Sequence, residues 1–210
     1  MFPIIYLQNL NNYYAHNYLK IFTFNIMIDP SNGVLLIAEP FLKDFSFARS
    51  VVLICKHNEE EGTFGFSIHK KLHTTLDKII DDMAGFKIPV YLGGPVQTDT
   101  LHYIHQYPEL FSDAVEITDN VFWGGDFALL KKYIKEETVD ISKIKFFLGY
   151  SGWSAGQLED EMKEKSWITL QSNKQLIFET APQDIWPICL TTLGGKYKMM
   201  VHFPTDPQLN

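Results

Sequence analysis

The chain has 210 residues, of which 46% are hydrophobic, and a formal net charge of −7. This length and composition predict one well-buried domain rather than two. An acidic chain offers no broad basic surface to phosphates, and Arg49 is its only arginine, so it lacks the guanidinium groups that usually contact guanine and the DNA backbone. We therefore expect no direct binding to nucleic acid.

The two cysteines and the lengths of the apolar runs indicate a cytoplasmic location. Cys55 and Cys189 lie far apart and belong to no CxxC pair or zinc-type cluster, which is typical of a reducing environment. No apolar run approaches the roughly 20 residues of a membrane-spanning helix, and the N-terminus lacks the features of a secretory signal. We expect a cytoplasmic protein without a cofactor, a metal site or membrane contact.

Residues 1–26 are rich in Asn, Tyr and Phe and differ in composition from the rest of the chain. We interpret them either as a disordered N-terminal arm or as upstream sequence read into the frame, in which case Met27 is the initiator. Residues 27–210 are predicted to form the single domain.

The first half of this domain is predicted to be mainly strands. Val34 to Ala38 and Val51 to Cys55 are apolar runs of strand length, and Phe64, Phe66 and Ile68 alternate with small residues. The second and third of these strands are expected to form a hairpin.

A helix is predicted next, capped by Thr74 and ended by Gly85. Apolar residues at helical spacing, from Leu76 to Met83, favour it. Val90 to Leu92 then reads as a short strand that runs into the paired glycines Gly93 and Gly94, where the backbone is free to adopt unusual angles.

The middle of the chain repeats a strand, glycine and helix pattern. Val115 to Ile117 and Asn120 to Trp123 are predicted to form a hairpin. Gly124 and Gly125 follow it, and Asp126 is the expected N-cap of a helix that buries Leu130 and Ile134.

The run Phe146 to Trp167 is the most informative stretch. Its first three residues are predicted to form a buried strand, and Gly149 and Gly152 to make a tight reversal. Ser154 and Gln157 fit a capping box, so a helix is expected to begin at about Ala155.

The C-terminal region is predicted to contain a hairpin and a helix. Trp167 to Leu170 and Gln175 to Phe178 are the two expected strands. The helix spans 183–193, buries Cys189 and ends at Gly194 and Gly195.

Seven short segments of the sequence resemble those of a known family. In chain order they are LLIAEP, FARSVVLIC followed by KH, GTFGFSI, YLGGPVQ, WGGDFALL, FLGYSGWSAGQLEDEM and KSW. In this order they resemble the YqgE/AlgH family of bacterial proteins over residues 33–195, and GGPVQ and GWxAGQLE are the most specific of them.

The resemblance implies an α+β domain with a central, largely antiparallel sheet that closes partly into a barrel and is surrounded by helices. It implies no established catalytic activity, although the name attached to the family is that of a transcriptional regulator. The chain departs from the family pattern at residues 69–71, where His-Lys-Lys replaces Asn-Arg-Pro, and at Ser151 and Ser154. A site that needed that Asn or Arg would be altered.

The candidate binding residues gather at the glycine-rich corners. Amides at the helix starts near Ala155 and Phe127 would attract an anion, whereas carboxylates at 159–161 would repel one, and the glycines have a purely structural interpretation in close packing. Arg49 is expected either to clamp a carboxylate ligand or to pair with an internal acid. The candidates are Arg49, Gly93, Gly94, Gln97, Gly124, Gly125, Gly152, Trp153, Gly156 and Gln157.

No residue is predicted to be catalytic. Ser151 lacks the glycine spacing of a nucleophile elbow, and no nucleophile is visible beside His57. His102 and His105 point oppositely on an extended segment, and His105 is expected to donate to a backbone carbonyl rather than bind a metal.

Two function classes remain. The first is a non-enzymatic regulatory or adaptor domain that binds a protein or small ligand, with an exposed Trp153 or Trp123 as the anchor. The second is an enzyme or binding domain for a small anionic metabolite at the glycine-rich helix starts.

Overall fold

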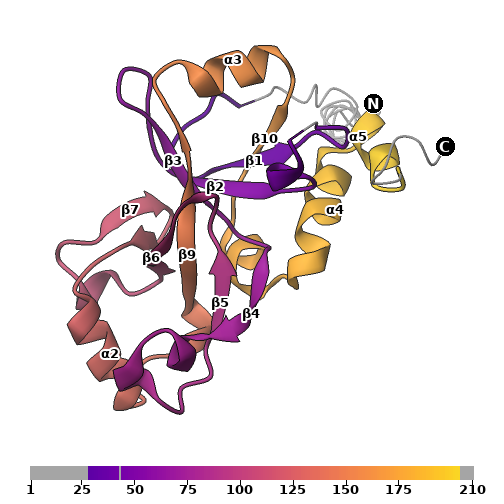
Figure 1. The fold of residues 1–210 in the computed structure, drawn as a ribbon. Helices are drawn as coiled ribbons and strands as arrows, with labels where there is room; N and C mark the ends of the chain where they lie inside the picture. The colour runs from indigo at the N-terminus through magenta and orange to yellow at the C-terminus, as the bar shows by residue number, and fades with distance from the viewer. Residues whose placement is uncertain (1–27, 43, 204–210) are drawn as a thin grey trace, which may run out of the picture.

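The computed structural model describes residues 28–42 and 44–203, and the predicted extension, residues 1–26, lies outside them together with Met27 (Figure 1). Ten strands form one sheet. Its main path is β10 (Trp167–Gln171), β1 (Val34–Ala38), β2 (Val51–Asn58), β3 (Gly62–Ser67), β9 (Ile144–Trp153), β6 (Val96–His105), β8 (Val121–Trp123) and β7 (Val115–Thr118). Two further strands, β4 (Lys71–Thr75) and β5 (Pro89–Leu92), attach to this path through β9.

The sheet is largely antiparallel, which confirms the expected α+β class. Among the described strands only β5 and β9 pair in parallel. The sheet is open, because β10 and β7 end its path without pairing to each other. It nevertheless curls, since Ile117 of β7 and Val121 of β8 share a core with Leu53 and Cys55 of β2.

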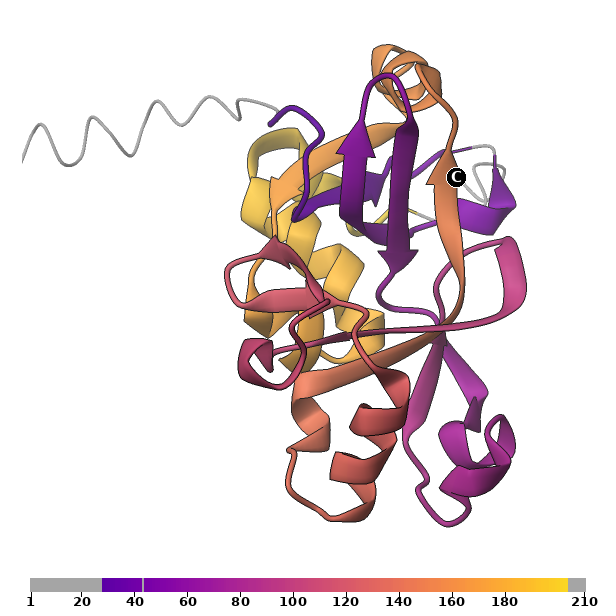
Figure 2. The same cartoon turned by 90° about the vertical axis from the view of Figure 1, so that its left-hand side faces the viewer.

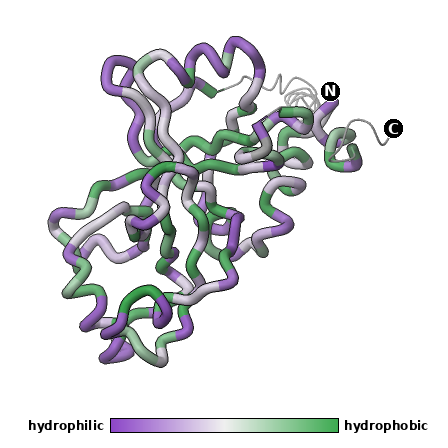
Figure 3. The backbone as a smooth tube through the Cα atoms, in the orientation of Figure 1, coloured by the Kyte–Doolittle hydropathy of each residue, from purple (hydrophilic) through white to green (hydrophobic). Residues whose placement is uncertain are grey.

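The first two strands lie between two helices. Leu35 and Ile37 share a core with α4 (Pro182–Leu193), whereas Leu36 shares another core with Leu158 of α3 (Gln157–Lys163). Both faces of β1 are therefore buried, which explains its unbroken apolar sequence. Figure 1 shows α3 and α4 on opposite sides of these strands, and Figure 3 shows that most residues of α3 are hydrophilic.

A second core lies under α2 (Phe127–Lys135). Leu130 and Ile134 pack there with Tyr103 of β6 and Phe146 of β9. The predicted N-cap is confirmed, because the carboxylate of Asp126 accepts hydrogen bonds from the amides of Ala128 and Leu129. The predicted hairpin before it is also present as β7 and β8.

The helix predicted from Thr74 to Gly85 is wrong. Strand β4 continues to Thr75, and only two short 3₁₀ turns follow, η2 (Leu76–Lys78) and η3 (Asp81–Met83). The amide of Leu76 donates to the carbonyl of Ile88, so this segment bonds across to the start of β5 instead of along itself. Leu76 and Met83 are still buried, as a helix would have required.

Two predictions in the second half of the chain are also wrong. The reversal expected at Gly149 and Gly152 does not occur, because β9 continues through both residues to Trp153. The second strand of the C-terminal hairpin is instead a π-helix, η6 (Gln175–Glu179), whose first turn is held by the side chain of Asn173.

The predicted capping box is half formed, and the C-terminal helix is confirmed. Gln157 accepts a hydrogen bond from the amide of Ser154 at 3.1 Å, but α3 begins two residues later than expected, after Gly156 with φ +77°. Helix α4 ends at Gly194 and is followed by α5 (Gly195–Met200), which the sequence did not predict. No helix in the described ranges combines the length and apolarity needed to cross a membrane.

The two halves of the sheet meet where β5 and β6 pass β9. A Cβ atom on Gly93 would lie 2.2 Å from the carbonyl oxygen of Gly149, and one on Gly94 would lie 2.2 Å from the carbonyl group of Tyr150. Real Cβ atoms do not approach so closely, so only glycine fits at both positions. In Figure 2, β6 runs across the middle of the molecule beside β9.

We predict that Gly94→Ala destabilises the protein by about 3 kcal/mol or more, because the added methyl group collides with backbone that cannot move aside. Gly152→Ala is the matched control. Its Cβ would meet the ring edge of Tyr150 at 3.1 Å, which a side-chain shift relieves, so we expect a loss of about 1 kcal/mol or less. Urea unfolding followed by circular dichroism measures both, and equal stabilities would contradict the steric argument.

Candidate functional site

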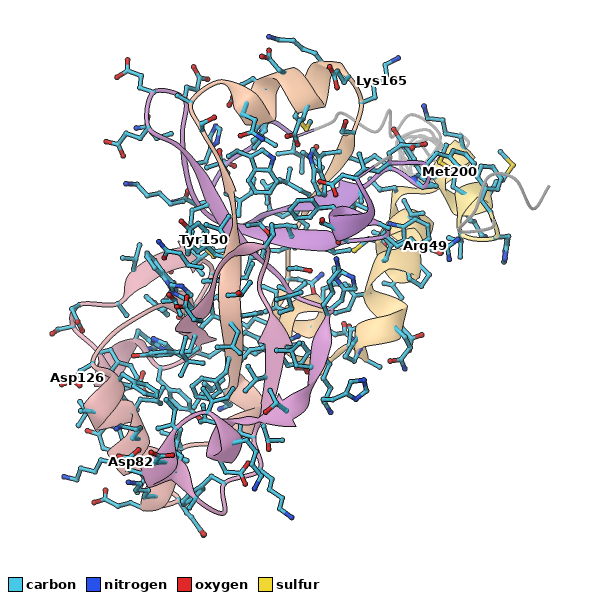
Figure 4. The ribbon with its side chains drawn as sticks, in the orientation of Figure 1. Arg49, Asp82, Asp126, Tyr150, Lys165 and Met200 are labelled. Atoms are coloured by element: carbon cyan, nitrogen blue, oxygen red, sulfur yellow. The ribbon has the colours of Figure 1, made fainter. Side chains whose placement is uncertain are left out.

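An open groove of about 580 Å³ lies where β3, β6, β8 and β9 meet. Four half-buried rings line it, one from each strand, and we call it the aromatic groove: Phe64, His102, Trp123 and Tyr150. Lys56 and Glu61 lie at its rim and form an exposed ion pair at 2.9 Å. Tyr150 occupies the upper part of β9 in Figure 4.

The rings of the aromatic groove support one another. Phe64 is central, with its ring centroid 4.8 Å from Trp123 and 5.1 Å from Tyr150. Gly152 lies directly opposite Phe64 in the register of β3 and β9 and carries no side chain to cover the rings. The groove therefore exists because a glycine stands at a position where most residues would fill it.

His102 contributes a polar atom to this apolar surface. Its Nε2 is buried and has no hydrogen-bond partner within the described part of the chain. Burial lowers the pKa of His102, so the ring is neutral near pH 7. A buried unpaired nitrogen costs free energy, and because this atom lies beneath the surface of the groove, the cost is part of the fold.

A His, Thr and Glu arrangement borders the groove and was missed from the sequence. His57 Nδ1 lies 2.7 Å from the hydroxyl of Thr63, and His57 Nε2 lies 3.8 Å from a carboxylate oxygen of Glu159. The predicted hairpin contained the signal, since its register places His57 opposite Thr63. Thr63 is only 5% exposed, so the contact satisfies a buried hydroxyl and does not present a nucleophile.

Trp153 is not the exposed anchor that we expected. It is 5% exposed, and its indole N–H donates to Glu161 Oε2 at 2.8 Å. The indole of Trp167 donates to the same oxygen at 2.7 Å, and Gln157 donates to the other oxygen at 2.9 Å. Glu161 of α3 thus holds that helix onto the ends of β9 and β10 through Trp153 and Trp167, and Gln157 supports its carboxylate from within the helix.

The amides predicted to attract an anion are already engaged or flanked by acids. The Asp126 carboxylate accepts from the first free amides of α2, and Glu159 and Asp160 occupy the first turn of α3. Gly125 has φ +107°, and a Cβ there would lie 2.8 Å from Phe111. Gly124 has φ +82° and its carbonyl lies 3.0 Å from His105 Nε2, which confirms the backbone contact expected for that histidine.

Arg49 lies apart from the other candidates, beside α4 (Figure 4). It has φ +52°, donates to the carbonyl of Phe203, and its guanidinium carbon lies 5.0 Å from the ring centroid of Trp186. Among the described residues it forms no ion pair with an acid, and neither the internal salt bridge nor the carboxylate clamp that we considered is seen there. Its observed contacts secure the C-terminal segment.

The remaining candidates surround the crossing of β9. Gly93 and Gly94 come from the β5 to β6 connection, Gln97 comes from the start of β6, and Gly152 and Trp153 come from β9 itself. Gln97 is exposed, has φ +46° and lies in the irregular stretch of β6 that follows the pairing of Val96 with Tyr150. Gly156, by contrast, only begins α3.

The described residues offer no site suited to a metal. No group of three or more His, Cys, Asp or Glu side chains comes together among them. Cys55 and Cys189 are buried and unpaired, and burial raises the pKa of both thiols, that of Cys189 to about 12. Neither thiol is therefore a ready ligand or nucleophile.

Comparison with protein families and sequences gives a consistent picture. A family model described as AlgH-like matches residues 35–198. A UPF0301 protein of Cytophaga hutchinsonii is 41% identical over 181 residues, which cover 86% of this chain and 99% of the relative. A UPF0301 protein of Bacteroides fragilis is also 41% identical, over 91% of this chain and 96% of the relative.

Solved structures share the fold. The solution structure of the AlgH protein from Pseudomonas aeruginosa is 26% identical, with a TM-score of 0.67, and covers 82% of this chain and 94% of its own. A crystal structure of a Corynebacterium diphtheriae protein has a TM-score of 0.71 at 20% identity, over 86% of this chain and 97% of its own.

We predict that Glu161→Gln destabilises the protein by about 1–3 kcal/mol, because two indole N–H groups lose a charged acceptor. Glu164→Gln, an exposed carboxylate on the same segment, is the control and is expected to change stability by less than about 0.5 kcal/mol. Thermal unfolding followed by tryptophan fluorescence measures both. Equal behaviour of the two variants would show that the Glu161 contacts are unimportant.

Proposed function

The chain belongs to the AlgH-like family, and from this premise we propose that it is a non-enzymatic regulatory or adaptor domain that binds a protein partner at the aromatic groove. The observation that carries the proposal is the gathering of four half-buried rings around one open groove. Aromatic side chains at the centre of an interface contribute most of its binding free energy. The polar rim of Lys56 and Glu61 matches the usual anatomy of such a surface.

The chemistry of the groove supports binding rather than catalysis. The hydroxyl group of Thr63 lies beside the imidazole of His57, but Thr63 is almost fully buried and does not face a substrate. His102 is a neutral imidazole whose unpaired Nε2 is buried beneath the rings, so the groove presents ring surface rather than an accessible base. We therefore assign the groove a recognition role.

A protein partner also accounts best for the regulator name attached to the family. With a net charge of −7 the chain would be repelled by DNA, so an influence on transcription would pass through another protein. The unpaired, buried cysteines are typical of a protein that acts in the cytoplasm.

A small anionic metabolite is the alternative occupant, and its support is weaker. The amides at the start of α2 already bind the protein's own carboxylate at Asp126, at 2.8 and 3.0 Å. An anion that bound there would have to displace the side chain of Asp126 from these amides. The alternative remains a distinct outcome of the binding experiment below.

We predict that Tyr150→Ser weakens partner binding at least tenfold, about 1.4 kcal/mol. The reason is that it removes a ring from the centre of the groove. Tyr133→Ser is the matched control, since Tyr133 is equally half-buried but lies on α2, away from the groove. The partner is captured from lysate of the source cells with the full chain, purified, and titrated by calorimetry against both variants.

Two results would contradict the proposal. One is a stoichiometric partner that binds the Tyr150→Ser protein as tightly as the parent. The other is a saturable thermal shift with a nucleotide or phosphorylated metabolite that Tyr150→Ser leaves intact, which would favour the anionic ligand instead.

Direct DNA binding is tested separately. We predict that a gel-shift assay with genomic fragments at physiological salt shows no retention by the full chain at micromolar concentration. The reason is that DNA binding is driven by basic side chains that displace the counterions of the phosphates, and this acidic chain offers no broad basic surface. Retention that weakens steeply with added salt would overturn this expectation and would restore direct operator binding as a function.

A further inference from the structure

Lys145 of β9 is a buried amine that the proposed function does not use. It is 6% exposed, although it stands on a strand at the centre of the sheet. Its Nζ donates to the carbonyl of Ile177 at 3.0 Å and lies 4.2 Å from the ring centroid of Tyr91. No described Asp or Glu lies within ion-pair distance of it.

A small hollow of about 180 Å³ opens beside this amine. Its walls are mainly apolar and come from β5, the turn before β9, and η6; they include Ile88, Tyr91, Ile141, Ile144, Lys145 and Phe178. The Nζ atom lies between Tyr91 and the Ile177 to Phe178 segment, and Tyr91 and Phe178 both line the hollow. The amine therefore stands at the wall of the hollow.

The surroundings of this amine favour its uncharged form, in contrast to those of an exposed lysine. Burial lowers the pKa of Lys145 to about 7. The ionisable groups that face it are Tyr91, whose pKa is raised by burial, and His69, whose pKa is lowered to about 4 by burial and by nearby lysines, including Lys145. Neither is an anion near neutral pH, so no negative charge offsets the cost of burying a charged lysine, and only the Ile177 carbonyl and the Tyr91 ring stabilise the proton.

We propose that Lys145 and this hollow form a covalent capture site for small, uncharged aldehydes or ketones. The nitrogen lone pair attacks the carbonyl carbon and forms a C–N bond, and the carbonyl oxygen takes up protons and leaves as water, giving an imine. No oxidant or reductant is needed. The apolar walls exclude charged carbonyl compounds such as keto acids, because no cation other than the lysine itself lines the hollow.

The size of the hollow limits the ligand. An engineered apolar cavity of about 150 Å³ accommodates benzene. A volume of about 180 Å³ therefore suits a ligand with a ring or a short chain of about six carbons. Benzaldehyde satisfies both the size and the polarity and serves as the probe.

The competing explanation is structural: Lys145 only ties η6 to the sheet through Ile177. To separate the two, the full chain is incubated with benzaldehyde and sodium cyanoborohydride at several pH values, and modified lysines are located by peptide mass spectrometry. We expect Lys145 at pH 7 to be modified at least tenfold faster than the exposed Lys163. The rate at Lys145 should level off above about pH 7, whereas the rate at Lys163 rises toward about pH 10.

A second variant tests the hollow while keeping the amine. Ile141→Trp places a large ring in the space that the aldehyde would occupy, and it should abolish the preference for Lys145 without unfolding the protein, as circular dichroism will show. Lys145→Met should remove the modified peptide altogether. Modification of Lys145 no faster than that of Lys163, or unchanged modification in folded Ile141→Trp, would overturn the proposal.

Discussion

The close approach of backbones at the glycine crossing is the constraint on which the rest of the structure depends. Strand β9 pairs with β3, β5 and β6, so it belongs to both halves of the sheet. These pairings are compatible only because Gly93 and Gly94 carry no side chain where they meet Gly149 and Tyr150. The distinctive glycines of this chain therefore serve packing, and the placement of functional side chains follows from them.

The aromatic groove is a consequence of this crossing and of the tryptophan contacts above it. Glu161 binds the indoles of Trp153 and Trp167, which fixes the end of β9 against α3. Both tryptophans point inward, and the rings that line the neighbouring groove are those around Tyr150. The run from Phe146 to Trp167 thus supplies both the buried tryptophans that support the groove and Tyr150, which lines it. The sequence had instead suggested that Trp153 is exposed.

The elements that the sequence predicted well are those determined by local patterns. Apolar runs identified β1 and β2, and Asp126 identified the start of α2, because a cap needs only residues a few positions apart. The helix predicted at Thr74 had correct apolar spacing, but the competing hydrogen bond from Leu76 to Ile88 depends on a strand that lies elsewhere in the chain. Pairing across the sheet likewise decided the position of His57, and contacts with Trp186 and Phe203 near the other end of the chain decided that of Arg49; a local pattern can show neither.

The aromatic groove and the hollow at Lys145 both include residues of β9, but they lie on either side of Gly149. Lys145 and Tyr150 are five residues apart, but Gly149 between them has φ +65° and interrupts the regular alternation of the strand. The backbone at Gly149 is closely packed, since a Cβ atom there would lie 2.7 Å from the carbonyl oxygen of Val96, and coupling between two sites needs an element that has two arrangements. On this packing argument, the binding proposed at the groove and the capture proposed in the hollow are expected to be independent of each other.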